Sequence, residues 1–292
     1  MTDATTVPAT LRWEWAAVAA ATAFLVAGGA WLLALTIDGD GAFLLGLLLD
    51  LARLSARGIV DLADAVWIAA GFASVRWLPP VAAVSGFQLW FAYRHLDANR
   101  PDGADGGVSV HRSLGLPNLV TLARGALLAA LAGFATLTPW PEIAWLPAVL
   151  YGSACGLDLL DGFLARRSER TTLLGAKLDL AIDTTGFLVA PVVGVFWNQL
   201  PVWYLALSAA RYLFKLGCWL RRRRGKPVAD LPQSRLRRPL AGLQMGFITV
   251  ALVPIVPLAA VRPVAAVVLA ASLSVFVRDY LVVAGVSGSG DG

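Results

Sequence analysis

The chain has 292 residues, of which 58% are hydrophobic and only 15% are charged, whereas an average soluble domain is about 45–50% apolar and about 25% charged. This composition excludes an ordinary soluble enzyme and a disordered chain, and the sequence lacks the alternating pattern of an outer-membrane barrel. The formal charge of +5 indicates contacts with anionic headgroups, and we expect no nucleic-acid partner. The composition therefore predicts an all-α polytopic membrane protein.

Residues 1–111 are expected to comprise an N-terminal membrane region of about two helices and, at its end, a linker. A first span is predicted at 15–37, and 42–63 has the mixed composition of an interfacial amphipathic helix. Residues 65–93 are interrupted by Arg76 and by Pro79-Pro80, so they form either one kinked span or two short segments. The polar stretch 94–111 is the predicted linker.

Beyond the linker, residues 112–286 are predicted to form a six-span core, and residues 287–292 a disordered tail. Each apolar run is long enough to cross the hydrocarbon layer, for which about 20 residues suffice. The six predicted spans are 119–137, 143–160, 173–197, 201–220, 240–260 and 264–283.

Arginine placement predicts which loops face the cytoplasm, because cytoplasmic loops carry an excess of Lys and Arg. Arginines fall in alternate loops, whereas the opposite loops carry only Arg262. We therefore expect an integral protein of the cell or inner membrane with its active site at the cytoplasmic face. The arginines in question are Arg94, Arg100, Arg112, Arg166, Arg167, Arg170, Arg221 to Arg224, Arg235, Arg237 and Arg238.

Four aspartates lie in or beside two consecutive predicted spans. Asp158 and Asp161 are three residues apart, and Asp179 and Asp183 are four apart, so each pair projects from one face of its helix. Four carboxylates at membrane depth would repel one another, so a cation must balance them. Oxygen ligands suit Mg²⁺, Mn²⁺ or Ca²⁺, and a two-metal site for phosphoryl transfer is the natural extrapolation. A structural ion-pair cluster or an ion-transport path is the alternative.

Small residues lie one helical turn from three of these carboxylates. Gly162 and Ala165 follow Asp158 and Asp161 by four residues, and Gly175 precedes Asp179 by four. They leave room for a bulky ligand such as a nucleotide, whose diphosphate would be held by metal and by Arg166.

The segment 158–183 matches the signature DxxDGxxAR(x8)GxxxDxxxD, and by it the chain resembles the CDP-alcohol phosphatidyltransferase family. The stretch Pro117-Asn118-Leu-Val-Thr121-Leu-Ala-Arg124 is similar to the entry of the first core helix in that family. The resemblance covers about residues 116–283 and implies a six-helix core with a polar cavity that faces the cytoplasm. It leaves residues 1–112 without a counterpart.

The resemblance implies a role for each motif residue. Asp158, Asp161 and Asp179 would be ligands of Mg²⁺ or Mn²⁺, and Asp183 would be the general base as well as a metal ligand. Gly162, Ala165 and Gly175 would admit the cytidine, so the expected nucleotide site comprises Asp158, Asp161, Gly162, Ala165, Arg166, Gly175 and Asp179.

Five further residues are candidates for the wall of the site or for binding the acceptor. Asn118, Thr121 and Arg124 could line the site, although the Asn and Thr could equally satisfy helix contacts. Arg211 is a charge in the middle of a span, which favours a cavity-facing role with an acceptor phosphate. Arg238 resembles the first basic residue of the GKxKTxxQ segment of glycerol-phosphate-specific members, but Leu240 and Ala241 depart from that segment.

The expected function is transfer of a lipid phosphate group from a CDP-linked lipid donor to a small polar alcohol, with release of CMP, in phospholipid biosynthesis. A reaction of CDP-choline or CDP-ethanolamine with diacylglycerol is an alternative within the family. A non-catalytic membrane protein that carries divalent cations or binds lipid is the alternative outside it. Membrane lipids are expected partners, and a homodimer is an open alternative.

Overall fold

The computed structural model describes residues 7–38, 73–101, 110–167, 172–228 and 237–284. All regular structure in these ranges is helical, which confirms the predicted all-α class. The chain forms two compact units, residues 1–189 and residues 190–292. The division falls within helix α7, Leu173–Phe196.

Four of the described helices are long and apolar enough to cross a membrane: 9–37, 115–136, 173–196 and 258–283. Helix α6, Leu146–Arg167, contains a shorter apolar stretch, Leu146–Leu160. The protein is therefore an integral membrane protein, and the division into an N-terminal region, a six-span core and a tail stays a prediction. The interfacial helix predicted at 42–63 and the predicted tail lie outside the described residues.

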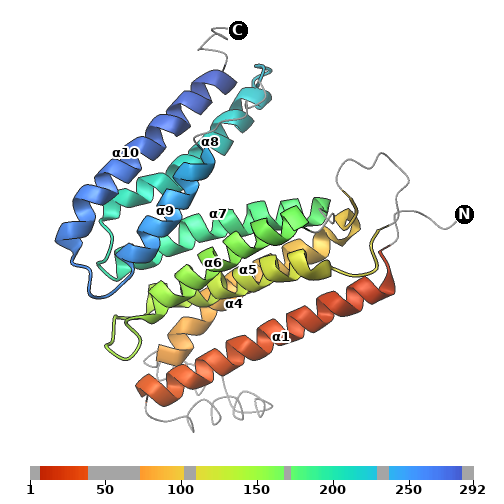
Figure 1. Cartoon of the computed structure of the whole chain (residues 1–292), viewed down its shortest axis with the longest axis horizontal. Helices are drawn as coiled ribbons and strands as arrows, with labels where there is room; N and C mark the ends of the chain where they lie inside the picture. Colours follow the sequence, from red (N-terminus) through yellow and green to blue (C-terminus); the bar gives the residue numbers. More distant parts are fainter. Residues whose placement is uncertain (1–6, 39–72, 102–109, 168–171, 229–236, 285–292) are drawn as a thin grey trace, which may run out of the picture. The chain divides into compact units, whose positions relative to one another are not determined.

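In the first unit, α5 (Gly115–Gly133) packs against α4 (Ala73–Arg94) and α6, and α1 (Ala9–Leu33) packs on α4 (Figure 1). Helix α1 ends in the π-helical turn Ala34–Asp38, so the first predicted span exists and begins six residues earlier than predicted. The buried cluster at one end of these helices is apolar and draws on α1, α4, α5 and α7. It contains Leu11, Ala92, Leu96, Ala98, Val110, Leu114, Leu122, Leu174 and Leu178.

Polar contacts fix the N-terminal helices to the helices that follow. Glu14 on α1 accepts a hydrogen bond from the backbone amide of Leu114 at 2.7 Å, where α5 begins. A carboxylate in this position satisfies an amide that lacks a partner within the helix and also complements the helix dipole. The hydroxyl of Thr10 donates to the carbonyl of Arg112 at 2.9 Å, so α1 is held at two points to the start of α5.

Helix α4 continues through Pro79 and Pro80 as one helix from Ala73, which excludes a break at the proline pair within the described part of the chain. Proline has no amide hydrogen, so Pro80 leaves the carbonyl of Arg76 without its helical donor. The hydroxyl of Thr136 donates to that carbonyl at 2.7 Å, and the guanidinium of Arg76 donates back to the carbonyl of Thr136. The helix therefore passes the prolines because a neighbouring turn replaces the lost hydrogen bond.

In the second unit, α10 (Leu258–Val283) packs against α8 (Ala206–Arg223) and α9 (Arg237–Ala251). The predicted boundary between the last two spans was wrong. Helix α9 ends at Ala251 and not at residue 260, because Pro254 and Pro257 cannot supply the amides that a continuing helix needs. The intervening loop is 252–257, and Arg262 lies within α10.

Candidate active site

The guanidinium of Arg124 lies among the carboxylates of the motif. This side chain is on α5 and is only 2% exposed. It contacts Asp158 on α6 at 2.7 Å, Asp179 on α7 at 2.8 Å, and Asp183 on α7. Asp179 and Asp183 are one turn apart, so both carboxylates reach the same guanidinium. Three helices thus bring the charged groups to one point.

The cluster carries excess negative charge and is open on one side. Three carboxylates against one guanidinium leave two net negative charges, and the side chains of Asp158, Asp179 and Asp183 are 33%, 48% and 32% exposed. One oxygen from each carboxylate lies within 4.8 Å of the others. Oxygen-only donors at this separation fit a hard divalent cation such as Mg²⁺ or Mn²⁺. The convergence of these three aspartates agrees with the geometry expected from their spacing.

Four other predicted residues, namely Asp161, Gly162, Ala165 and Arg166, lie in the last turns of α6. Their side chains fall outside the described part of the structure. Their roles as a metal ligand, as space for the nucleotide and as a cation beside the diphosphate stay predictions.

Gly175 lies against a polar network of the protein itself. A Cβ atom at this position would be 2.8 Å from Oδ1 of Asn118 and 3.3 Å from Oγ1 of Thr172. The hydroxyl of Thr172 accepts a hydrogen bond from the amide of Gly175 at 3.0 Å, which is the N-cap arrangement at the start of α7. Close approach of Asn118 is therefore a structural reason for glycine here, independent of any nucleotide.

Asn118 and Thr121 are buried and are engaged by helix and loop contacts. The side-chain amide of Asn118 donates to the carbonyl of Leu114 at 2.8 Å and to Oδ1 of Asn99 at 3.2 Å. The hydroxyl of Thr121 donates to the carbonyl of Pro117 at 3.0 Å. Arg124, the third α5 candidate, contacts the aspartates. Sequence spacing did not pair Arg124 with the aspartates, because Arg124 belongs to another helix.

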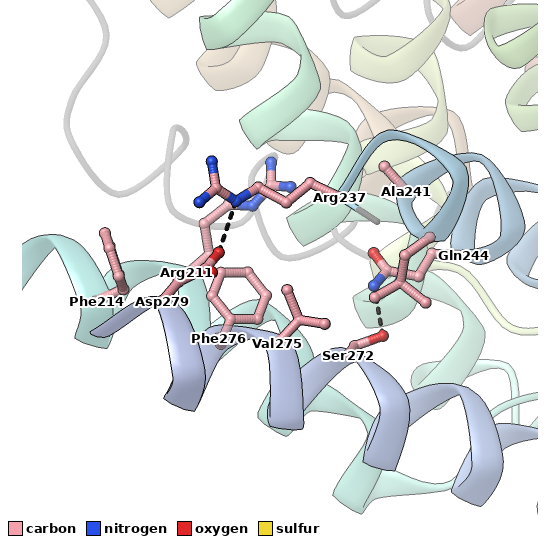
Figure 2. A pocket seen from close by; sticks show the side chains of 10 residues that line it. Arg211, Phe214, Arg237, Ala241, Gln244, Ser272, Val275, Phe276 and Asp279 are labelled. Atoms are coloured by element: carbon pink, nitrogen blue, oxygen red, sulfur yellow. Dashed lines mark hydrogen bonds and ion pairs between the residues drawn. The ribbon is translucent and has the colours of Figure 1, made fainter. Parts of the chain in front are cut away.

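A second polar feature is a pocket of about 180 Å³ lined by residues of α8, α9 and α10. Figure 2 shows Arg211 and Arg237 at one end of the pocket and the Gln244–Ser272 hydrogen bond at the other. Val275 and Phe276 lie between these two ends, and Phe214 also lines the pocket. The pocket combines two cations with an aromatic surface.

Asp279 holds the cationic end of this pocket in place. Its carboxylate accepts a hydrogen bond from Nε of Arg237 at 2.6 Å and contacts Arg278 at 3.0 Å. Nη2 of Arg237 is buried and has no hydrogen-bond partner within the described ranges. Arg238, the predicted candidate, is exposed and is not a lining residue, whereas Arg211 is. Asp279 was missed, although an acidic residue in an apolar span is itself a signal of a polar site.

Comparison with known proteins agrees with this geometry. The family model for CDP-alcohol phosphatidyltransferase matches residues 114–277, a stretch that contains Arg124 and all four motif aspartates. The chain belongs to the CDP-alcohol phosphatidyltransferase family. Members of this family generally depend on a divalent metal ion, which fits the three clustered carboxylates. The match begins at Leu114 and leaves α1 and α4 outside it.

Curated relatives of the family include a cardiolipin synthase (CMP-forming) of Streptomyces coelicolor, 34% identical over 128 residues, or 41% of this chain and 57% of that protein. A CDP-diacylglycerol–glycerol-3-phosphate 3-phosphatidyltransferase of Yersinia enterocolitica is 34% identical over 100 residues, or 33% of this chain and 52% of that one. One of the same name from Pectobacterium atrosepticum is 36% identical over 99 residues, or 32% and 50% of the two chains. The chain thus spans about half the length of these relatives. No solved structure matches it.

Proposed function

We propose that this protein transfers a lipid phosphate group from a CDP-linked lipid donor to a small polar alcohol and releases CMP. The observation that carries the proposal is the convergence of Asp158, Asp179 and Asp183, from the family signature, on one point of three packed helices. The named relatives are phosphatidyltransferases and a cardiolipin synthase that forms CMP. Two of the helices that carry the site residues, α5 and α7, are long and apolar enough to cross a membrane, which suits a lipid donor.

In this proposal Asp183 takes the proton of the acceptor hydroxyl. Its carboxylate is about one-third exposed, so a substrate hydroxyl can reach it, and a positioned carboxylate base contributes roughly 10²–10⁴-fold to such a reaction. Asp158, Asp161, Asp179 and Asp183 would hold Mg²⁺ or Mn²⁺, with two ions in the site. When bound, the ions would neutralise the diphosphate of the donor and the CMP that leaves. Gly162, Ala165, Arg166 and Gly175 would surround the nucleotide at the cytoplasmic face.

The pocket of α8, α9 and α10 is proposed to bind an anionic group of a ligand. Arg211 and Arg237 line it, and the buried Nη2 of Arg237 can donate a hydrogen bond to a phosphate oxygen. Its apolar wall favours a ligand with a lipid part. A lipid acceptor is the second candidate for the reaction, because the Streptomyces relative is named a cardiolipin synthase. Nothing in the described part of the chain supports the homodimer, and the proposed reaction does not require one.

CMP release by purified protein in liposomes tests the proposal. The protein is supplied with Mg²⁺, CDP-diacylglycerol and, one at a time, glycerol 3-phosphate, inositol phosphate, inositol, serine and phosphatidylglycerol. We expect release with one of the small acceptors, whereas release with phosphatidylglycerol alone selects the lipid acceptor. Release only from CDP-choline or CDP-ethanolamine with diacylglycerol selects the alternative within the family. Nucleotide or metal binding without any CMP release contradicts the enzymatic proposal.

A further inference from the structure

Arg124 uses the same carboxylates that the family's divalent cations require. Its Nη1 atom lies 2.7 Å from Oδ1 of Asp158 and 2.8 Å from Oδ1 of Asp179. Its Nη2 atom contacts Oδ1 of Asp183. One oxygen of each aspartate is thus already taken by a positive charge. The contacts are those that a cation bridging the three carboxylates would make.

We propose that Arg124 is a resident counter-cation that competes with divalent metal ions for these aspartates and so lowers the metal affinity of the site. The proposal rests on the proposed function in one respect, namely that the site binds a divalent metal ion. It concerns the binding of that metal in the absence of substrate. Arg124 is not a catalytic residue in this proposal, because the guanidinium acts on the aspartates and not on substrate.

The charges of the cluster explain why the metal-free site needs a resident cation. Without Arg124, the carboxylates of Asp158, Asp179 and Asp183 would repel one another at the edge of an apolar environment. With Arg124 in place, the metal-free site keeps its carboxylates together. The side chain is held there because it is 2% exposed and comes from the middle of α5.

The same contacts oppose metal binding in two ways. A metal that binds the three Oδ1 atoms must either share them with the guanidinium, and the two cations then repel each other, or displace it, and the Arg124 contacts are then lost. A metal that binds other oxygens of these carboxylates lies within a few ångströms of a like charge, and the repulsion is only partly screened near a half-buried site. In either case, the removal of the arginine charge strengthens metal binding.

A purely structural role predicts the opposite sign. If Arg124 only holds the aspartates in position, its loss lets them separate, and the metal then binds more weakly. The direction of the change in metal affinity therefore distinguishes competition from support. No substrate or turnover enters this comparison.

The experiment is a titration of purified full-length protein in detergent with Mn²⁺, read from the electron paramagnetic resonance signal of the free ion. Arg124→Gln removes the charge, and Arg262→Gln is the matched control because Arg262 is exposed and lies in the other unit. We expect the Mn²⁺ dissociation constant of Arg124→Gln to fall at least about tenfold and that of Arg262→Gln to stay unchanged. A higher or equal dissociation constant for Arg124→Gln overturns the proposal.

A second variant and a second measurement keep the proposal testable if Arg124→Gln folds poorly. Arg124→Lys keeps the charge but has no planar fork to bridge three carboxylates, so we expect Mn²⁺ affinity to rise by a smaller factor, and weaker binding than wild type overturns the proposal. Melting temperatures with and without Mn²⁺ should differ more for both variants than for wild type. Wild-type protein that binds Mn²⁺ but releases no CMP contradicts the proposed function alone, whereas absence of saturable Mn²⁺ binding overturns both.

Discussion

Replacement of Gly175 by alanine separates a structural from a nucleotide-binding reason for this glycine. The added Cβ would lie 2.8 Å from Oδ1 of Asn118 and 3.3 Å from Oγ1 of Thr172. The first distance requires Asn118 to move, yet its amide is held by the carbonyl of Leu114 at 2.8 Å and by Asn99 at 3.2 Å. Overpacking of this kind costs about 1–3 kcal/mol, so Gly175→Ala should destabilise the ligand-free protein by that amount.

A double-variant cycle isolates the contact. In an Asn118→Ala background the amide is gone, so Gly175→Ala should cost less than about 0.5 kcal/mol, which gives a coupling of at least about 0.5 kcal/mol. Gly242→Ala is the control, because a Cβ there has open space within 4 Å and alanine is the better helix former. The assay is thermal unfolding in detergent without nucleotide or metal. Equal effects of Gly175→Ala in both backgrounds, or no effect in the wild-type one, would refute the reasoning.

Two further predictions concern the polar contacts that support each unit. Thr136→Val removes the hydroxyl that donates to the carbonyl of Arg76 at 2.7 Å and should lower the free energy of unfolding by about 1–2 kcal/mol. Thr184→Val removes a hydroxyl that donates within its own helix, to the carbonyl of Leu180 at 2.7 Å, and should lower it by less. Equal losses would contradict the idea that Thr136 replaces the missing amide of Pro80. Asp279→Asn leaves Arg237 and Arg278 without their shared carboxylate and should lower the free energy of unfolding by about 1–3 kcal/mol. The double variant Asp279→Asn/Arg237→Gln should recover part of this loss in chemical unfolding. If the effects of the two substitutions simply add, the pair is not coupled.

The sequence predicted the parts of the molecule that depend on local spacing. Aspartates spaced three or four residues apart lie on one face of a helix. Asp158, Asp179 and Asp183 do converge in the structure. The length of the apolar run predicted α7 to within one residue of its C-terminal end. Proline positions could have corrected the boundary of α9, since Pro254 and Pro257 precede the start of α10.

Contacts between residues distant in the sequence could not be predicted. The partner of the aspartates, Arg124, is 34 residues before Asp158 and belongs to another helix, so spacing carries no information about their contact. The same holds for Glu14, which caps α5 across 100 residues, and for the hydroxyl of Thr136, which replaces a lost helix hydrogen bond in α4. Each of these depends on how helices pack, and single-sequence periodicity does not determine packing.

CMP release by wild-type protein beside Asp183→Asn, with CDP-diacylglycerol, the active acceptor and Mg²⁺, tests the central claim most directly. Asp183→Asn keeps the shape of the side chain but cannot take a proton, and Glu142→Gln removes an exposed carboxylate elsewhere in the same unit. We expect turnover to fall by about 10²-fold or more for Asp183→Asn, to stay unchanged for Glu142→Gln, and to stop for wild type when the metal is chelated. Unchanged turnover of Asp183→Asn would contradict the assignment of the carboxylate cluster as the active site.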